Sequence, residues 1–300
     1  MKLSLLFTHL RTNVSKRSFN TKISCSVVET SSNEPPIVLA HGVLGNKNNF
    51  NSLSKHLVKL LGRSVVTYDA RNHGSSDHSN EMSLENMSND VLELLQRLGI
   101  YKCVLVGHSM GGRMAIHTAL HNPDIIDKLV VVDSSPASSF SLSTSSDRES
   151  VLNYVKAMQR VTWNGNKSLS TARKDVDQQL LESVKDFSVR SFILTNVSEL
   201  SPGNFGWRVN LDAICNHLVQ SRQSEQTFKG LQYNKDTLFI GGGASPFIGY
   251  QDYPIIKQLF PKAVISHIPG GGHWVHSEKP SEFLQCIVSF IRPTAFPVFS

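Results

Sequence analysis

Short hydrophobic runs alternate along this chain with longer segments in which hydrophobic residues recur every three or four positions. The short runs are rich in β-branched residues and occupy positions 37–40, 64–68, 103–106, 129–132, 237–240 and 263–268. The clearest helical segment follows Ser83, a typical N-cap residue, and has the face Leu84, Met87, Val91, Leu94 and Leu98. This alternation is typical of βαβ units. We therefore predict an α/β fold over residues 35–292, with a mostly parallel sheet and helices on both faces.

The strand and helix alternation is interrupted between the runs at 129–132 and 237–240. Residues 138–146 are rich in serine, and the helical patterns that follow show no clear strand alternation. We predict that residues 136–232 are a helical cap inserted into a single catalytic domain, over the carboxyl edge of the sheet.

The first 28 residues differ from the rest in composition, since they hold five Lys or Arg residues and no acid. These five cations account for all but one of the formal net charge of +6. Spaced cations and serines without acids are typical of a mitochondrial transit peptide. We predict that residues 1–28 are such a peptide and that the protein is mitochondrial. A disordered tail and a secretory signal are the alternatives, and the apolar stretch 3–7 is short for a secretory signal.

The sequence does not support several other classes of protein. The nearly neutral remainder gives no reason to predict nucleic-acid binding. No segment approaches 18 consecutive apolar residues, so no transmembrane helix is predicted. The four cysteines are far apart and the histidines form no H-E-x-x-H pattern, so we predict neither a metal nor a cofactor.

The sharpest chemical signal is Gly107-x-Ser109-x-Gly111, placed between a predicted strand and a predicted helix. This context is that of a nucleophile elbow, in which a serine is presented on a tight turn. A serine hydroxyl is a weak nucleophile at neutral pH and needs a base from elsewhere in the fold. His273 follows the predicted strand 263–268 through a glycine-rich loop, and we predict that it is this base.

Acyl transfer also needs donors for the developing oxyanion. The loop His41-Gly42-Val43-Leu44-Gly45 follows the first predicted strand. We expect the backbone N–H groups of Val43 and Met110 to form the oxyanion hole, with His41 in a structural role.

The acid that would orient the base has two candidates. No carboxylate follows the strand at 237–240, where this topology usually places the acid, because the sequence there is Gly241-Gly242-Gly243-Ala244-Ser245. Asp133 ends the preceding strand, whereas Asp212 lies at a predicted helix N-terminus, which would equally explain an aspartate. We favour Asp133 because strand ends are rigid, and keep Asp212 as its rival.

The segment Asp69-x-Arg71 lies at the end of another predicted strand. An acid and a guanidinium there could bind a substrate anion. We interpret them instead as an ion pair that braces the loop, since charged pairs commonly fix turns.

Taken together, these motifs resemble the α/β-hydrolase superfamily across residues 35–292. The resemblance is carried by His41-Gly42-x-x-Gly45, Asp69-x-Arg71-x-x-Gly74-x-Ser76, Gly107-His108-Ser109-Met110-Gly111-Gly112 and Gly272-His273-Trp274. More narrowly, the chain resembles the abhydrolase domain-containing protein eleven subfamily. That narrower resemblance is carried by Tyr68-Asp69-Ala70-Arg71-Asn72-His73-Gly74, Trp207-Arg208-Val209-Asn210-Leu211-Asp212-Ala213 and Gly272-His273-Trp274-Val275-His276.

The resemblance implies a mitochondrial serine esterase or lipase that acts on acyl esters such as diacylglycerols. It implies Ser109 as nucleophile and His273 as base, and it can place the acid at Asp212. It also implies association with the 2-oxoglutarate dehydrogenase complex. A thioesterase or acyltransferase using the same triad remains an alternative, as does a non-catalytic protein that protects a mitochondrial enzyme complex.

Overall fold

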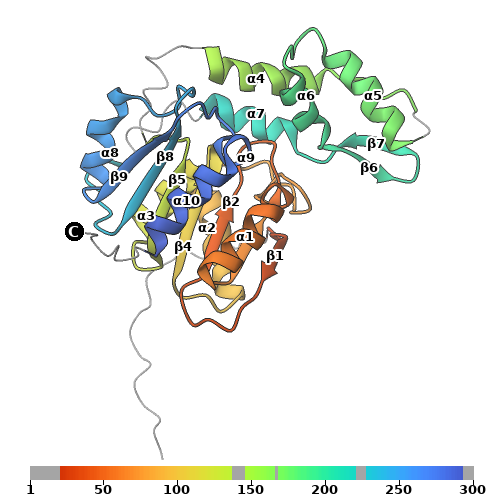
Figure 1. Cartoon of the computed structure of the whole chain (residues 1–300). Helices are drawn as coiled ribbons and strands as arrows, with labels where there is room; N and C mark the ends of the chain where they lie inside the picture. The colour runs from red at the N-terminus through yellow and green to blue at the C-terminus, as the bar shows by residue number, and fades with distance from the viewer. Residues whose placement is uncertain (1–20, 137–145, 166–167, 221–227, 293–300) are drawn as a thin grey trace, which may run out of the picture.

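A central sheet forms the body of the protein (Figure 1). The computed structural model describes residues 21–136, 146–165, 168–220 and 228–292. Within these residues the sheet has seven strands in the order β1-β3-β2-β4-β5-β8-β9. Their bounds are β1 Cys25–Val28, β2 Ile37–Ala40, β3 Val65–Tyr68, β4 Cys103–His108, β5 Ile126–Val132, β8 Thr237–Gly242 and β9 Ala263–Ile268. The strands pair in parallel except for β1, which is antiparallel to β3 at one edge.

Helices cover both faces of this sheet. One face is covered by α1 (Asn51–Leu61) and α10 (Pro280–Ile291). The other is covered by α2 (Leu84–Arg97), α3 (Met110–His121) and α8 (Tyr253–Leu259). Short helical turns η1 (Lys47–Phe50), η4 (Tyr250–Asp252) and α9 (Val275–Glu278) lie in the connections. The α/β architecture predicted from the hydrophobic pattern is confirmed.

The hydrophobic runs of the strands follow from this two-sided covering. In β4, Val104 and Val106 pack in the cluster with α1 and α10, whereas Cys103 and Leu105 pack in the cluster with α2 and α3. Successive side chains of a strand point to opposite faces, so a strand that is covered on both faces needs apolar residues at every position. Because β2, β4, β5, β8 and β9 run parallel to one another, their carboxyl ends lie at one edge of the sheet.

The chain between β5 and β8 forms a cap that lies at this edge (Figure 1). Its elements are α4 (Ser146–Gln159), α5 (Leu169–Leu180), α6 (Phe187–Leu194), β6 (Val197–Ser201), β7 (Asn204–Trp207) and α7 (Leu211–Gln220). All lie within the segment 136–232 that was expected to be inserted. Residues 137–145 and 221–227, near its two ends, lie outside the described residues.

The antiparallel hairpin of β6 and β7 was not expected from the sequence. Its strands are short, and the turn between them contains Pro202 and Gly203, where Gly203 has a φ of 74°. Proline presets the φ of a turn and glycine adopts positive φ without steric cost. This Pro-Gly pair was therefore the available signal for the hairpin.

The described part of the N-terminal segment belongs to the fold. Ile23 is buried in the hydrophobic core, and Cys25–Val28 pairs with β3 along its whole length. The predicted transit peptide, residues 1–28, therefore includes a strand of the sheet, and cleavage after residue 28 would remove that strand. A removable leader that leaves β1, the buried Ile23 and the backbone contact between Lys22 and Asp77 in place would end before Lys22. Residues 1–20 lie outside the described residues.

Candidate active site

Ser109 lies on the sharp turn between β4 and α3. It has a φ of 53° and a ψ of −115°, a conformation that non-glycine residues rarely adopt and that is held at a cost in strain. The turn is tight because a Cβ at Gly107 would lie 2.2 Å from the Gly111 carbonyl oxygen. A Cβ at Gly111 would lie 2.6 Å from the carbonyl oxygen of Ala40. The glycines of the motif are thus required by the close approach of the backbone, as a nucleophile elbow demands.

His273 approaches Ser109 from the loop between β9 and α9. Its Nε2 lies 3.1 Å from the Ser109 Oγ, a hydrogen-bond distance in which the hydroxyl donates to the ring nitrogen. The loop is held on both sides of the histidine. The His108 Nε2–H donates to the His273 carbonyl oxygen at 2.8 Å. The Glu278 carboxylate accepts from the backbone N–H groups of Gly272 at 2.6 Å and Trp274 at 3.1 Å.

Asp133 lies directly after β5, and its side chain contacts the other ring nitrogen of His273. The distance between His273 Nδ1 and Asp133 Oδ2 is 2.6 Å, and the Asp133 side chain is fully buried. Asp133 has a φ of 46°, and its backbone N–H donates to the Ile240 carbonyl oxygen on β8 at 2.7 Å. The structure therefore brings Asp133, His273 and Ser109 into one chain of contacts.

Asp212, the rival acid, lies elsewhere. It is an exposed residue in the first turn of α7, in the cap, where carboxylates favourably meet the positive end of the helix. Its Oδ1 accepts from the Gln159 Nε2 of α4 at 2.6 Å. Asp212 thus joins two cap helices, and the structure places the other aspartate, Asp133, beside His273.

The two segments expected to supply the oxyanion hole meet beside Ser109. A Cβ at Gly42 would lie 3.2 Å from the Ser109 Cβ, so the loop main chain passes close to the serine. Val43, the next residue of this loop, lines the same cavity as Ser109. Met110 is the first residue of α3, where backbone N–H groups have no acceptor within the helix. The positions suit the predicted roles of Val43 and Met110, which stay predictions.

Two buried histidines support the loop that carries Val43. His41 donates from Nδ1 to the Gly42 carbonyl oxygen at 2.8 Å, and its Nε2 accepts from the Ala70 N–H at 2.9 Å. The Nε2 of His73 accepts from the Leu44 N–H at 3.1 Å. Burial lowers the pKa of both rings, and for His73 the pKa falls to about 3. Both act as neutral hydrogen-bonding groups, which agrees with the structural role expected for His41.

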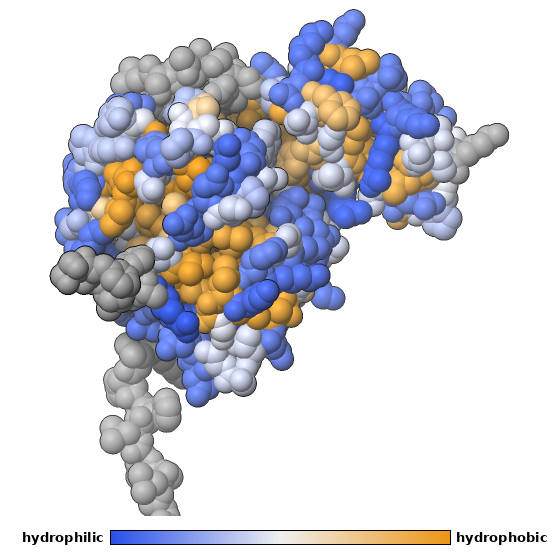
Figure 2. All heavy atoms as spheres, in the orientation of Figure 1, coloured by the Kyte–Doolittle hydropathy of each residue, from blue (hydrophilic) through white to orange (hydrophobic). Residues whose placement is uncertain are grey.

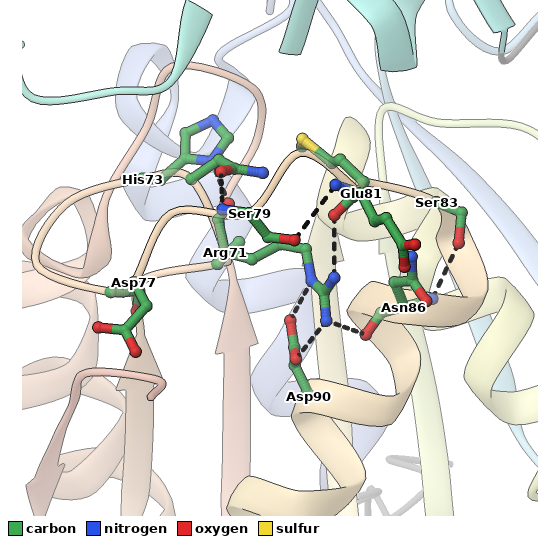
Figure 3. Close-up of polar contacts among 12 residues, drawn as sticks. Arg71, His73, Asp77, Ser79, Glu81, Ser83, Asn86 and Asp90 are labelled. Atoms are coloured by element: carbon green, nitrogen blue, oxygen red, sulfur yellow. Dashed lines mark hydrogen bonds and ion pairs between the residues drawn. The ribbon is translucent and has the colours of Figure 1, made fainter. Parts of the chain in front are cut away.

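Arg71 anchors the loop that contains His73 (Figure 3). Its fully buried guanidinium donates to both oxygens of Asp90 on α2, at 2.6 and 2.7 Å, and to the Glu81 carbonyl oxygen at 2.9 Å. The expected pair of Asp69 and Arg71 does not form. Asp69 instead pairs with Lys47 at 2.5 Å, so the loop is braced by charges as expected but with different partners.

A cavity of about 780 Å³ opens over Ser109 between the sheet and the cap. Its cap side includes the apolar or aromatic side chains of Val151, Tyr154, Val189, Phe192 and Ile193. Figure 2 shows hydrophobic residues on the cap where it adjoins the sheet. The described lining contains no Lys or Arg, whereas it contains two carboxylates, Asp186 and Glu278. The site is therefore suited to an apolar, uncharged ligand.

Four residues of this site were missed by the sequence analysis. His108 and Glu278 hold the His273 loop, Ser245 contacts Asp133 at 2.5 Å, and Asn196 of the cap contacts the Leu44 carbonyl oxygen at 2.9 Å. For Ser245 a signal existed, because it lies in the segment after β8 where an acid was sought. The contacts of His108 and Asn196 join distant parts of the chain whose proximity no local pattern reports, whereas Glu278 contacts backbone groups only four and six positions away. Within the described residues, no group of three or more His, Cys, Asp or Glu could hold a metal ion, and no helix is long and apolar enough to span a membrane.

Comparison with known proteins identifies the family. A model of the alpha/beta hydrolase fold family matches residues 35–280, and this protein belongs to that family. The predicted α/β-hydrolase fold is thereby confirmed. A solved structure described as a marine microorganism esterase is similar with a TM-score of 0.81 and 28% identity, over 90% of this chain and 99% of that one.

Individual relatives within this family show which of its members the chain resembles. A Danio rerio protein named sn-1-specific diacylglycerol lipase ABHD11 is 42% identical over 90% of this chain and 83% of its own length. The Mus musculus protein of the same name is 42% identical over 90% of this chain and 85% of its own length. A Saccharomyces cerevisiae protein named probable alcohol acetyltransferase is 32% identical over 86% of this chain and 77% of its own length. The resemblance to the abhydrolase domain-containing protein eleven subfamily is confirmed.

Proposed function

We propose that this protein is a serine hydrolase that cleaves carboxylic esters of neutral lipids, acylglycerols in particular. The observation that carries the proposal is the chain of contacts from Ser109 Oγ to His273 Nε2, at 3.1 Å, and from His273 Nδ1 to Asp133 Oδ2, at 2.6 Å. A nucleophile, a base within hydrogen-bond reach and an acid that orients the base are the parts that acyl transfer requires.

In the proposed reaction the Ser109 Oγ attacks the acyl carbon while His273 Nε2 takes the hydroxyl proton. The Asp133 carboxylate accepts from His273 Nδ1–H, which fixes the ring orientation and stabilises the imidazolium. The N–H groups of Val43 and Met110 donate to the oxyanion of the tetrahedral intermediate. The intermediate collapses to an acyl-enzyme as His273 returns the proton to the departing alcohol. Water, activated by His273, then releases the fatty acid and restores Ser109.

The substrate class is argued from the cavity and the relatives. Apolar side chains from the cap line the cavity above Ser109, and the described lining carries no cation that would attract a phosphate or carboxylate. The relatives from Danio rerio and Mus musculus are named as diacylglycerol lipases. A neutral lipid ester fits both observations, since its acyl chain would occupy the apolar part of the cavity and its ester would lie at Ser109.

The direct test is fatty-acid release from micellar diacylglycerol by the purified protein and its Ser109→Ala variant. We expect release by the wild type, and a loss of at least about 10³-fold in the variant because it lacks the nucleophile. Ser52→Ala, at an exposed position of α1, is the matched control and should remain active. Equal release by Ser109→Ala would contradict the proposal, and exclusive turnover of acyl thioesters would favour the thioesterase alternative.

The location and the partner remain predictions to be tested separately. We propose that a mitochondrial leader lies before Lys22, because the chain from Ile23 onward is part of the fold. A reporter fused to residues 1–21 should enter isolated mitochondria, and failure to enter would refute the proposed leader.

Association with the 2-oxoglutarate dehydrogenase complex is supported by the family resemblance and can be tested by co-purification. If Ser109→Ala co-purified with the complex and fully protected it, that would favour the non-catalytic alternative.

A further inference from the structure

Polar side chains outside the triad form part of the wall of the active-site cavity. Asn49 belongs to η1, and His276 and Glu278 belong to α9. All three come from the sheet domain, whereas the apolar side chains described above come from the cap helices α4 and α6. The cavity therefore has a polar wall in addition to its apolar cap side.

The His276 ring is packed among other rings and presents one nitrogen to the cavity. Its centroid lies 4.6 Å from that of His108, 5.5 Å from that of Phe50 and 5.9 Å from that of Phe283. Within the described residues its Nδ1 is buried with no hydrogen-bond partner, so a proton on that atom would have no acceptor. The favoured tautomer carries the proton on Nε2, which can donate it to a ligand. Burial, and to a smaller extent His273, lowers the pKa of His276 to about 4, so the ring is neutral near pH 7.

Asn49 presents its amide nitrogen to the same cavity. The Asn46 N–H donates to the Asn49 Oδ1 at 2.7 Å, a contact that fixes the orientation of the amide. A Cβ at Gly45 would lie 2.9 Å from this oxygen, so the glycine makes room for the side chain. The Nδ2 group is left with two protons for a ligand. Phe50, the next residue, packs against the His276 ring, so both donors belong to one part of the cavity wall.

We propose that Asn49 Nδ2 and His276 Nε2 form a subsite that binds a free hydroxyl on the alcohol part of the ester. This inference rests on the proposed function. Both donors are uncharged, so they suit an uncharged oxygen rather than a phosphate or a carboxylate. In this arrangement the acyl chain occupies the apolar cap side of the cavity and the alcohol part lies against the polar wall.

Glu278 supplies the acceptor that distinguishes a hydroxyl from an ester carbonyl. Its oxygens accept from the N–H groups of Gly272 and Trp274, and each carboxylate oxygen has a further lone pair. A hydroxyl can accept from the two donors and donate to this carboxylate. An ester carbonyl can only accept, and its oxygen would be repelled by the carboxylate.

Two esters that differ in one group test the subsite. 3-Hydroxypropyl butyrate and butyl butyrate share the acyl group, and their alcohol parts differ only in a terminal hydroxyl against a terminal methyl. The hydroxyl is as many bonds from the ester as the free hydroxyl of a 1,2-diacylglycerol is from the sn-1 ester. We expect the wild type to favour the hydroxy ester at least fivefold in kcat/KM, because the butyl ester leaves the donors unpaired. A ratio of one or less would overturn the proposal.

Two variants locate this preference. His276→Phe keeps an aromatic ring and removes both nitrogens, and Asn49→Ala removes the amide. Each should lower the ratio of kcat/KM for the two esters about threefold, the usual effect of one hydrogen bond between uncharged groups. Asn49→Ala also removes the acceptor of the Asn46 N–H, but that loss affects both esters and cancels in the ratio. Asn48→Ala, at an exposed neighbouring position outside the described lining, is the matched control and should keep the wild-type ratio.

The outcomes separate the subsite from the proposed function. A wild-type ratio that neither His276→Phe nor Asn49→Ala lowers, with both folded in urea titrations, would overturn the assignment of the hydroxyl to these residues. Asn49 is exposed, so Asn49→Ala still tests the assignment if His276→Phe does not fold. Failure of the wild type to cleave either ester or diacylglycerol would instead refute the proposed function.

Discussion

Asn196, in the cap, donates from Nδ2 to the carbonyl oxygen of Leu44 at 2.9 Å. Asn196 is almost fully buried, and Leu44 belongs to the loop beside Ser109 and has a φ of 61°. The N–H of Leu44 is bound in turn by His73. The peptide groups around Leu44 are thus held from the cap and from the sheet domain. The position of the cap and the geometry of the loop that carries Val43 are therefore coupled.

Loss of this contact should affect catalysis. In Asn196→Ala the buried Leu44 carbonyl loses a donor, which costs about 1–3 kcal/mol, and the loop becomes free to move. We expect kcat for a p-nitrophenyl ester to fall about tenfold with little change in KM, since the proposed oxyanion donor, the N–H of Val43, would act mainly in the transition state. Asn153→Ala, at an exposed position of the cap helix α4, is the control. Unchanged kcat in a folded Asn196→Ala protein would contradict the coupling.

Glu278 should affect catalysis because it holds the loop that carries His273. Its two oxygens accept from the N–H groups on either side of His273, so Glu278→Ala frees the backbone of the base. We expect a three- to tenfold loss of kcat, an intermediate loss in Glu278→Gln, and less than about 1 kcal/mol of change in unfolding free energy because the site is exposed. Steady-state kinetics measure kcat, and urea titrations measure the unfolding free energy. Glu282→Ala, on the exposed surface of α10, should behave as wild type; an equal loss there would undermine the specific role of Glu278.

The charge of the cavity predicts discrimination between esters. Asp186 and Glu278 line it without a described cation, so an acyl group that ends in a carboxylate should be repelled. We expect kcat/KM for p-nitrophenyl hemisuccinate to be at least tenfold below that for p-nitrophenyl butyrate, which has the same acyl length. Asp186→Asn keeps the oxygen that caps α6 and should narrow the gap about threefold at low salt. Equal rates on the two esters in the wild type would show that the cavity does not select by charge.

The stability of the protein should depend on pH because His117 is a buried histidine. His117 is buried, and burial together with neighbouring His121 lowers its pKa to about 4. In the unfolded chain its pKa is about 6.5, so between pH 6.5 and 4 the unfolded state binds more protons and the free energy of unfolding falls as the pH falls. His117→Phe removes this site. Between pH 7 and 5 it should lose about 2 kcal/mol less stability than the wild type in urea titrations. The exposed His56→Gln is the control, and equal losses in wild type and His117→Phe would contradict the assignment.

The sequence was most informative where chemistry imposes a local pattern. The tight turn at Ser109 needs glycines at fixed spacing, and the strands covered on two faces need unbroken apolar runs. Both signals are local, so the tight turn that carries Ser109 and the sheet could be predicted. His273 could be predicted because it follows the last strand and a glycine loop.

The rest of the site depends on contacts between distant segments. Asp133 and Asp212 both had reasonable local explanations, and only the packing of β5 beside β8 and β9 places Asp133 near His273. Asn196 meets Leu44 across 152 positions of sequence, a distance over which no periodicity carries information. The end of the predicted N-terminal peptide could not be fixed from the sequence for a related reason. The composition of residues 1–28 is uniform, whereas the pairing of Cys25–Val28 with β3 is a tertiary property.

The central claim is that Ser109, His273 and Asp133 act together, and the paired variants Asp133→Asn and Asp212→Asn test it most directly. Each change replaces a carboxylate with an amide of the same shape. Measured on a p-nitrophenyl ester, kcat should fall about 10³- to 10⁴-fold in Asp133→Asn, because the imidazole loses its orienting anion. Asp212→Asn should stay within threefold of wild type, since Asp212 contacts Gln159 in the cap. The opposite result, with Asp133→Asn active and Asp212→Asn inactive while both are folded, would contradict the account.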